Sequence, residues 1–192
     1  CLVHELPGVI RQHELEQHTQ HIARNASKIV FPAQIVADGF AHFAHLDAAK
    51  LVIRPQGLYK RNAWAGTDRT AARSQLRHKL QIADDARIVL GVGYADYRKG
   101  IDLFVEAGAL VMAADPSAVF VWIGHHDLSF WSQVEGRVAQ SGYSDRFVFP
   151  GRDTDTDLYY AGADVFALTS REDPFPSVVL EALEVGLPVV GF

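Results

Sequence analysis

Short apolar segments alternate with longer amphipathic segments over the second half of the chain. Short apolar runs bounded by turn residues predict buried strands, and apolar positions three or four residues apart predict helices. The predicted strands cover residues 88–92, 119–124, 147–149, 165–168 and 188–192. Alternation of strands and helices at this spacing implies right-handed crossovers and a parallel, doubly wound sheet. The expected fold class is therefore α/β with a Rossmann-like sheet.

The first of the intervening helices has the clearest pattern. Its apolar stripe consists of Leu103, Phe104, Ala107, Leu110, Val111 and Ala114. Pro116 ends this helix because proline lacks the N–H that a continuing helix needs. Further helices are expected around residues 130–138 and 158–163, and after Pro176, which suits the first turn of a helix.

The first part of the chain predicts a smaller α/β unit. We expect a strand end at residues 2–3 with a loop after it, one helix over residues 12–25 and a second helix around residues 36–43. Short strands are expected at residues 28–31 and 51–53, the second followed by a Pro-Gln-Gly turn. These elements predict the C-terminal remnant of a second α/β domain over residues 1–59.

Residues 60–86 are more polar and predict the connection between two domains, with a helix that begins at Thr67. The main domain is then expected over residues 87–192. The chain opens at Cys1 without Met and stops within an apolar run at Phe192, so we expect a piece of a longer enzyme.

Composition excludes several classes of protein. The chain is 48% hydrophobic and 21% charged with a net charge of −5, which is typical of a globular domain and argues against nucleic-acid binding. The densest basic group is expected to be a solvated helix face rather than a phosphate-binding patch: Arg69, Arg73, Arg77 and Lys79. One cysteine excludes an internal disulfide, and no stretch approaches the roughly 20 apolar residues that span a bilayer. A cytoplasmic location is expected.

Candidate chemistry lies after the strand at residues 165–168. A charged turn with two prolines follows, and a helix then begins near Ser177. The open N–H groups of its first turn, near Ser177 and Val178, suit an anion at the carboxyl edge of the sheet. Asp173 lies before this helix start, and Glu181 shares a helix face with Ser177. The segment therefore predicts a phosphate site framed by two carboxylates.

The two carboxylates form a recognisable signature: an acidic residue is followed by seven residues and then by the Glu of a helical Leu-Glu-Ala segment. In this pattern the chain resembles the retaining glycosyltransferases of the GT-B fold, family 4 type, although Asp173 stands where that family usually has Glu. The neighbouring Glu172 is one position out of register, so either acid can fill the first role. The resemblance implies that the first acid contacts the donor sugar and that Glu181 holds the ribose hydroxyls of a nucleotide diphosphate-sugar.

A second loop follows the strand at residues 88–92. The family has a glycine, usually an Arg, and a Lys-Gly pair there; Gly93 and Lys99-Gly100 match, whereas Tyr94 replaces the Arg and Arg98 is an alternative cation. In the usual strand order the first and fourth strands are neighbours, so the two loops are expected to meet. Negative charge grows on the β-phosphate as the sugar leaves, and one preorganised donor such as Lys99 lowers the barrier by about 3 kcal/mol.

The resemblance completes the expected site. Lys99 and Asp173 are the expected catalytic residues, with Asp173 holding a sugar hydroxyl. Retaining members are assigned a front-face reaction without a metal, so no cofactor is expected besides the nucleotide-sugar. Relatives carry a His at a strand end that faces the donor, which implies a substrate contact for His4; a loop histidine without special role is the alternative. Asp153, Asp155 and Asp157 are expected to form a solvated turn rather than a metal site.

The expected partners are a nucleotide diphosphate-sugar donor and a carbohydrate or lipid-linked acceptor, as in bacterial polysaccharide or lipopolysaccharide assembly. Peripheral contact with the inner face of the membrane would come through the part of the acceptor domain outside this chain. Two alternatives stay open: a nucleotide-binding fragment without transfer activity, and a nucleotide-sugar epimerase or phosphorylase of the same fold. A dehydrogenase is disfavoured because the glycines at residues 91 and 93 lack the third glycine of a dinucleotide fingerprint.

Overall fold

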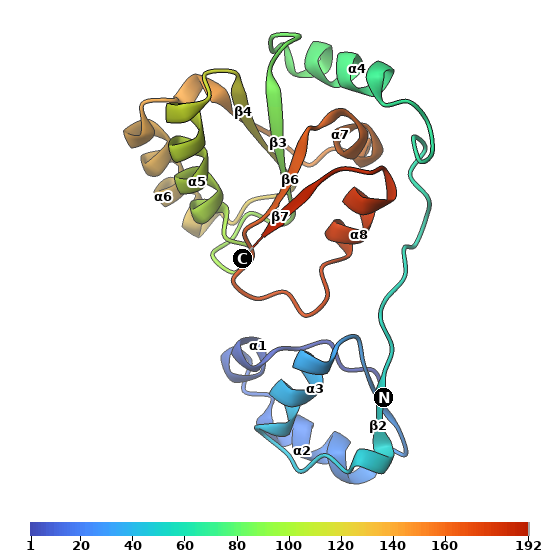
Figure 1. The fold of residues 1–192 in the computed structure, drawn as a ribbon. Coiled ribbons are helices and arrows are strands. Elements are labelled where there is room, and N and C mark those ends of the chain that lie inside the picture. The colour runs from blue at the N-terminus through green and yellow to red at the C-terminus, as the bar shows by residue number, and fades with distance from the viewer. Residues whose placement is uncertain (192) are drawn as a thin grey trace. The chain divides into compact units, whose positions relative to one another are not determined.

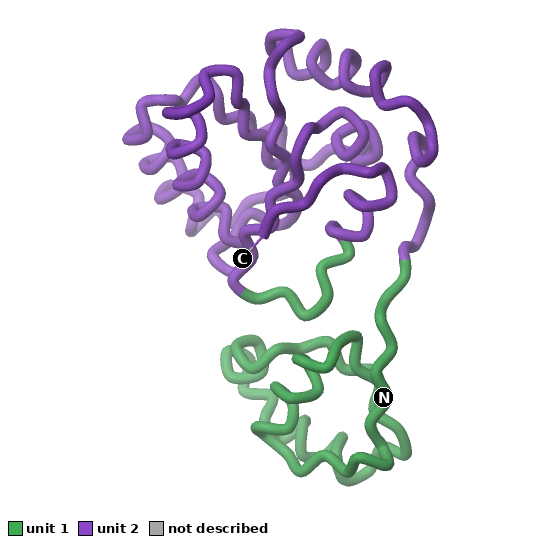
Figure 2. Tube along the Cα trace, viewed as in Figure 1, with its two compact units in different colours: residues 1–57, 172–177 green, residues 58–171, 178–192 purple. Residues whose placement is uncertain are grey.

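The computed structural model describes residues 1–191, and these form two compact units (Figure 2). Unit 1 consists of Cys1–Gly57 and Glu172–Ser177, and unit 2 consists of Leu58–Arg171 and the chain from Val178 onward. Residues 60–86, expected as a connection, lie in unit 2. Every helix among residues 1–191 is too short or too polar to cross a bilayer.

Unit 2 is built on a five-stranded parallel sheet with the order β5-β4-β3-β6-β7 (Figure 1). The strands are β3 (Arg87–Val92), β4 (Ala118–Ile123), β5 (Phe147–Gly151), β6 (Val165–Leu168) and β7 (Val189–Gly191). The expected α/β fold with a doubly wound parallel sheet is confirmed. Phe192, included in the last predicted strand, lies outside the described residues.

Helices cover both faces of this sheet, because successive strand residues point to opposite sides. Val119 and Val121 of β4 pack with α4 (Thr70–Leu80), α7 (Thr156–Gly162) and α8 (Ser177–Glu184). Phe120 and Trp122 of the same strand pack with α5 (Ile101–Ala114) and α6 (Leu128–Ser141), where the rings of Phe104 and Trp122 lie 5.1 Å apart. The sheet is thus buried on both faces, which explains its continuous apolar strands.

The winding of the sheet reverses between β3 and β6. β3 pairs with β4 on one side and with β6 on the other, so the first and fourth predicted strands are neighbours as expected. Open α/β sheets bind ligands beyond the carboxyl ends of the strands at such a reversal. The fold therefore places the loops after β3 and β6 at the edge where a ligand is expected.

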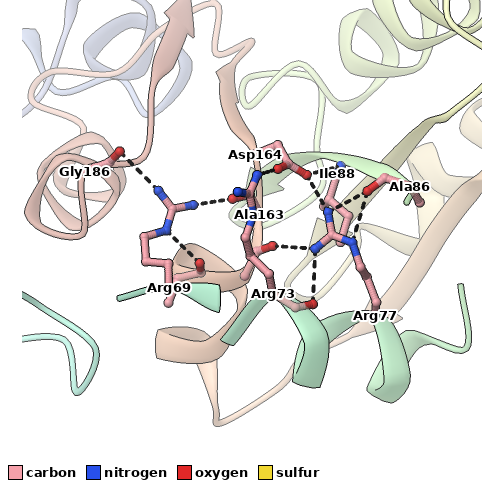
Figure 3. A network of polar contacts seen from close by, with 10 residues as sticks. Arg69, Arg73, Arg77, Ala86, Ile88, Ala163, Asp164 and Gly186 are labelled. Atoms are coloured by element: carbon pink, nitrogen blue, oxygen red, sulfur yellow. Dashed lines mark hydrogen bonds and ion pairs between the residues drawn. The ribbon is translucent and has the colours of Figure 1, made fainter. Parts of the chain in front are cut away.

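Three arginines, two in α4 and one at the residue before it, bind the end of α7 and the segment leading into β6 (Figure 3). Arg77 is 5% exposed and donates to the carbonyls of Ala86 and Gly162, and it pairs with the Asp164 carboxylate at 2.7 Å. Arg73 pairs with the other oxygen of Asp164, and Arg69 donates to the carbonyls of Ala161, Ala163 and Gly186. The expectation of a solvated basic face is wrong for Arg69 and Arg77, which donate to carbonyls at the end of α7 that otherwise lack donors. Arg73 and Lys79 are exposed as expected, although each pairs with an acid. The helix begins at Thr70 rather than Thr67.

Unit 1 contains the parallel pair β1 (Ile29–Phe31) and β2 (Leu51–Ile53) with α2 (Glu16–Asn25) and α3 (Gln34–Ala41). Phe31 and Phe40 form the centre of its core, with ring centroids 5.3 Å apart. The helix expected over residues 12–25 is present as α2, but it starts only at Glu16. The chain instead forms α1 (Pro7–Gln12), then turns through Glu14 at φ 54° before α2 begins. Pro7 starts α1 because its fixed φ suits a first helical residue.

The arginine network predicts a large stability cost for Arg77→Met. The substitution keeps an unbranched side chain but removes the Arg77 donors from the Asp164 carboxylate and from the carbonyls of Ala86 and Gly162, so we expect a loss of about 3 kcal/mol in the free energy of unfolding. Urea unfolding followed by circular dichroism measures it. Arg87→Met, which removes an exposed ion pair with Asp115, is the control and should change stability little. Equal effects of the two variants would contradict the role of the network.

Candidate functional site

The loop after β3 is shaped around Gly93 and Asp96. Gly93 has a φ of 149°, and a Cβ added there would lie 3.5 Å from Cδ and Cε of Lys99, so the lysine side chain runs alongside this glycine. The carbonyl of Gly93 accepts from Nε1 of Trp122 at 3.0 Å. The backbone N–H of Lys99 donates to Oδ1 of Asp96 at 2.6 Å, which closes the turn before α5. The loop thus holds Lys99 in a defined backbone position at the carboxyl edge of the sheet.

This loop meets the end of β6, as the strand order predicts. Gly100 has a φ of 69°, and a Cβ there would lie 2.0 Å from the carbonyl oxygen of Thr169, so only glycine fits. The Thr169 hydroxyl donates to the carbonyl of Lys99 at 3.3 Å, and the N–H of Arg171 donates to the carbonyl of Arg98 at 2.8 Å. The backbone around Lys99 is therefore fixed directly by the strand that precedes the acidic segment.

An ion pair with a buried carboxylate reinforces this junction. Both guanidinium NH groups of Arg171 contact the carboxylate of Asp102, at 2.8 and 2.9 Å, and Arg171 also donates to the carbonyl of Tyr97 and stacks on its ring at 3.8 Å. Burial would raise the pKa of Asp102, which is 3% exposed, but the hydrogen bonds and charge of Arg171 hold that pKa below its usual value. Sequence reasoning missed this pair, whose only signal was an acid in a first helical turn and an arginine just after a strand.

Glu181 lies in the second turn of α8 and lines a pocket of about 260 Å³ in unit 2. The pocket lining includes Tyr59, Lys60, Asn62, Asp157, Tyr160 and Glu181. Lys60 pairs with Asp157 at 2.8 Å, and the N–H of Asn62 donates to Oε2 of Glu184 at 2.8 Å. The segment after residue 58 is therefore attached to α7 and α8 by polar contacts beside Glu181.

The acids after β5 are not a solvated turn, so that expectation is wrong for two of the three. Asp157 binds Lys60 and the N–H of Ala63, and Asp153 accepts from the hydroxyl of Tyr159 and pairs with Lys79. The hydrogen bond from Lys79 is the largest cause that lowers the pKa of Asp153, to about 2. Packing of α4 and the linker against α7, which no local pattern shows, supplies these partners.

The structure divides the predicted site residues between the two units. Gly93, Arg98, Lys99, Val178 and Glu181 lie in unit 2, whereas His4, Glu172, Asp173 and Ser177 lie in unit 1. The joint action of Lys99 with either acid of the segment stays a prediction.

Two residues of the unit 1 group have defined neighbours there. The ring nitrogen Nδ1 of His4 lies 2.7 Å from Nε2 of Gln56. Gly8 of α1 leaves room for the carboxylate of Glu172, since a Cβ at Gly8 would lie 2.2 Å from its Oε1. Gln56 and Gly8 were not singled out from the sequence.

Unit 2 is a doubly wound α/β domain in which a ligand site is expected at the carboxyl ends of β3 and β6. The model of the family Glycosyl transferases group 1 matches residues 72–192, and the chain belongs to this family. The resemblance found in the sequence is thereby confirmed.

Curated relatives and solved structures agree with this membership. The chain is 25% identical over 182 residues to mannosylfructose-phosphate synthase of Agrobacterium fabrum, covering 91% of this chain and 39% of that protein. It is 29% identical over 160 residues to the lipopolysaccharide core biosynthesis mannosyltransferase LpsB of Rhizobium meliloti, covering 81% and 44%. Less than half the length of these two relatives is therefore spanned.

The structural neighbours support the GT-B fold. A crystal structure of Anabaena HepE in complex with UDP and glucose superposes with a TM-score of 0.83 at 21% identity, covering 99% of this chain and 51% of that one. The structure of WaaG, a glycosyltransferase involved in lipopolysaccharide biosynthesis, gives a TM-score of 0.80 at 18% identity, covering 99% and 55%.

The junction of the two loops predicts a specific glycine requirement. Gly100→Ala must push the Thr169 carbonyl away as well as strain the backbone, so it should destabilise unit 2 by more than the roughly 1 kcal/mol typical of a left-handed alanine. Gly142→Ala is the matched control, with a φ of 77° and no atom within 4 Å of the added Cβ. Thermal unfolding of both variants measures the difference. An equal decrease in Tm for the two variants would show that the close contact with Thr169 does not contribute to the effect of Gly100→Ala.

Proposed function

We propose that the chain forms the donor-binding part of a retaining glycosyltransferase. The enzyme moves a hexose-type sugar from a nucleotide diphosphate-sugar to a carbohydrate or lipid-linked acceptor, without a metal. The observation that carries this proposal is the junction at Gly100, which fixes the backbone of Lys99 beside the point where the winding of the sheet reverses. The chain that forms this sheet belongs to the family Glycosyl transferases group 1. A lipid-linked acceptor would bring the protein to the inner face of the membrane, from the cytoplasm.

The relatives support the donor class. HepE has been crystallised with UDP and with UDP-glucose, and LpsB is named as a mannosyltransferase. Both names fit a nucleotide diphosphate-sugar as the co-substrate of this chain. The part of LpsB in lipopolysaccharide core biosynthesis fits the proposed acceptor class.

Lys99 is proposed to bind the diphosphate. Gly93 has no side chain, so phosphate oxygens can approach the loop closely, and the ammonium beside it would face the charge that grows on the β-phosphate. Open N–H groups at the start of α8, at Ser177 and Val178, would bind the same anion. Arg98 is the second cation available in the loop, which lacks the arginine usual after the glycine.

The carboxylates are proposed to hold the sugar and the ribose. Asp173, or Glu172 beside it, would accept from a sugar hydroxyl and steady the oxocarbenium-like state; Glu181 would accept from ribose hydroxyls. The acceptor hydroxyl attacks the anomeric carbon from the side of the leaving group as the bond to the phosphate oxygen breaks. The departing diphosphate takes the proton of that hydroxyl, so no metal or separate base is required. His4 is proposed to face the donor from the acceptor side.

A second candidate function is nucleotide binding without transfer. The observation that favours it is coverage: the chain spans 39% and 44% of the two curated relatives, so more than half of each of those proteins has no counterpart in it. Calorimetry with a nucleoside diphosphate, followed by a transfer assay on the same sample, separates the two functions.

Substitution of the three central residues tests the proposed function in the whole protein. Lys99→Ala should lower donor turnover about 100-fold, because one preorganised charge is lost from the transition state. Asp173→Ala should lower turnover as well, and Glu181→Ala should mainly raise KM for the donor, since ribose binding is unchanged along the reaction. Arg87→Met, at the opposite end of β3, is the control with normal turnover. Unchanged turnover in all three variants would end the proposal.

The donor itself can be identified by thermal stabilisation. A nucleotide-sugar that binds the folded chain raises its Tm by mass action, and the preferred donor at equal concentration gives the largest rise. A panel that varies the base and the sugar separately identifies each. No rise with any nucleotide-sugar or nucleoside diphosphate would contradict donor binding.

A further inference from the structure

Tyr160 combines full burial with an unsatisfied polar group. The residue is 1% exposed, and within residues 1–191 its hydroxyl has no hydrogen bond of acceptable distance and angle. Buried hydroxyls nearly always have a partner, because an unpaired one costs free energy. Tyr160 is therefore an exception that requires an explanation.

The neighbouring Tyr159 shows the usual arrangement. It is equally buried, and its hydroxyl donates to Oδ2 of Asp153 at 2.9 Å. The two adjacent tyrosines of α7 thus differ in one respect: the first has a carboxylate partner in place, whereas the second has none.

The pocket beside Tyr160 has three carboxylates, of which Glu184 already accepts from the N–H of Asn62. Tyr160 and Glu181 line the same 260 Å³ pocket, together with Lys60, Asn62 and Asp157. Burial is the largest cause that raises the pKa of Tyr160, followed by the charge of the Glu181 carboxylate and its hydrogen-bond interaction with the phenol, ahead of the charge of Asp157. Asp157 already binds Lys60 and the N–H of Ala63. Glu181 thus lies in the same pocket within reach of the phenol, but their contact falls short of a well-aligned hydrogen bond.

We propose that Tyr160 is a positioning residue for Glu181, and that its buried hydroxyl donates to the Glu181 carboxylate when this carboxylate binds the hydroxyls of a ligand. This inference rests on the proposed function, in which Glu181 accepts from the ribose of the donor.

The chemistry of the carboxylate allows both tasks at once. A carboxylate has about four acceptor sites, so one oxygen can accept from the phenol and still face a vicinal diol. The buried phenol does not compete with the ligand for the same acceptor site of the carboxylate. Its hydrogen bond orients the Glu181 carboxylate. A ligand diol that binds Glu181 would favour the carboxylate orientation that also accepts a well-aligned hydrogen bond from the phenol.

The test compares nucleoside diphosphates with and without ribose hydroxyls. UDP, GDP and ADP, each with its 2′- and 3′-deoxy analogues, are titrated calorimetrically into the whole protein and into Tyr160→Phe. We expect Tyr160→Phe to weaken the best-bound ribonucleotide about five-fold, the usual worth of one hydrogen bond, and to reduce its advantage over the deoxy analogues. The Tm without ligand should stay equal or rise, because the substitution removes an unsatisfied buried hydroxyl.

Two further variants separate positioning from a structural role. In a Glu181→Ala background, Tyr160→Phe should have no additional effect on affinity, since the residue acts only through Glu181. Tyr159→Phe, which loses the bond to Asp153, should lower the Tm but keep the preference for ribonucleotides. Unchanged ribonucleotide preference in Tyr160→Phe, or an equal effect without Glu181, would overturn the inference while the donor site stands. Absence of binding by every nucleotide would instead reject the proposed function, and the inference with it.

Discussion

The backbone of Gly100 packs so closely against the carbonyl of Thr169 that no side chain can stand between them. This approach joins the start of α5 to the end of β6 across the reversal of the sheet. The backbone position of Lys99 is therefore set by packing against the end of β6 rather than by the loop alone. The Arg171–Asp102 pair holds the same junction from the side, and the burial of Asp102 makes the pair costly to break. The proposed phosphate contacts depend on this rigidity, because a charge stabilises a transition state most when it needs no reorganisation.

A second constraint acts at the opposite edge of unit 2. The arginines of α4 satisfy carbonyls at the end of α7 and the carboxylate of Asp164, which also accepts from the N–H of Ile88 (Figure 3). Because α7 carries both Tyr159 and Tyr160, this network sets the position of the helix from which the two tyrosines reach toward Asp153 and Glu181. The same short helix α7 therefore carries both the carbonyls that the arginines bind and the tyrosine proposed to position Glu181.

The pocket beside Glu181 draws on distant parts of the chain. Lys60 and Asn62 come from the segment after unit 1, and they reach Asp157 of α7 and Glu184 of α8. The result is an acidic pocket whose charges are partly paired, with one buried phenol left over. Such an arrangement leaves Glu181 as the acid able to accept from a hydroxyl-bearing ligand, and it gives the linker a role in shaping the pocket.

The sequence alone determined the strands of the main sheet, their parallel order and the meeting of the loops after β3 and β6. These follow from local patterns, since a run of apolar residues or a helical apolar stripe indicates that a segment is buried, but not what it packs against. The family signature around Asp173 and Glu181 and the Lys99-Gly100 pair were likewise readable as local motifs.

Only the tertiary structure decided which charged side chains are buried or paired. Arg77, Asp102 and Asp157 find partners far along the chain, and helix α1 appears where a loop was expected, because packing across distant segments overrides local polarity. The unsatisfied hydroxyl of Tyr160 is of the same kind: a tyrosine is one letter in a sequence, and whether its hydroxyl has a partner depends on what folds against it.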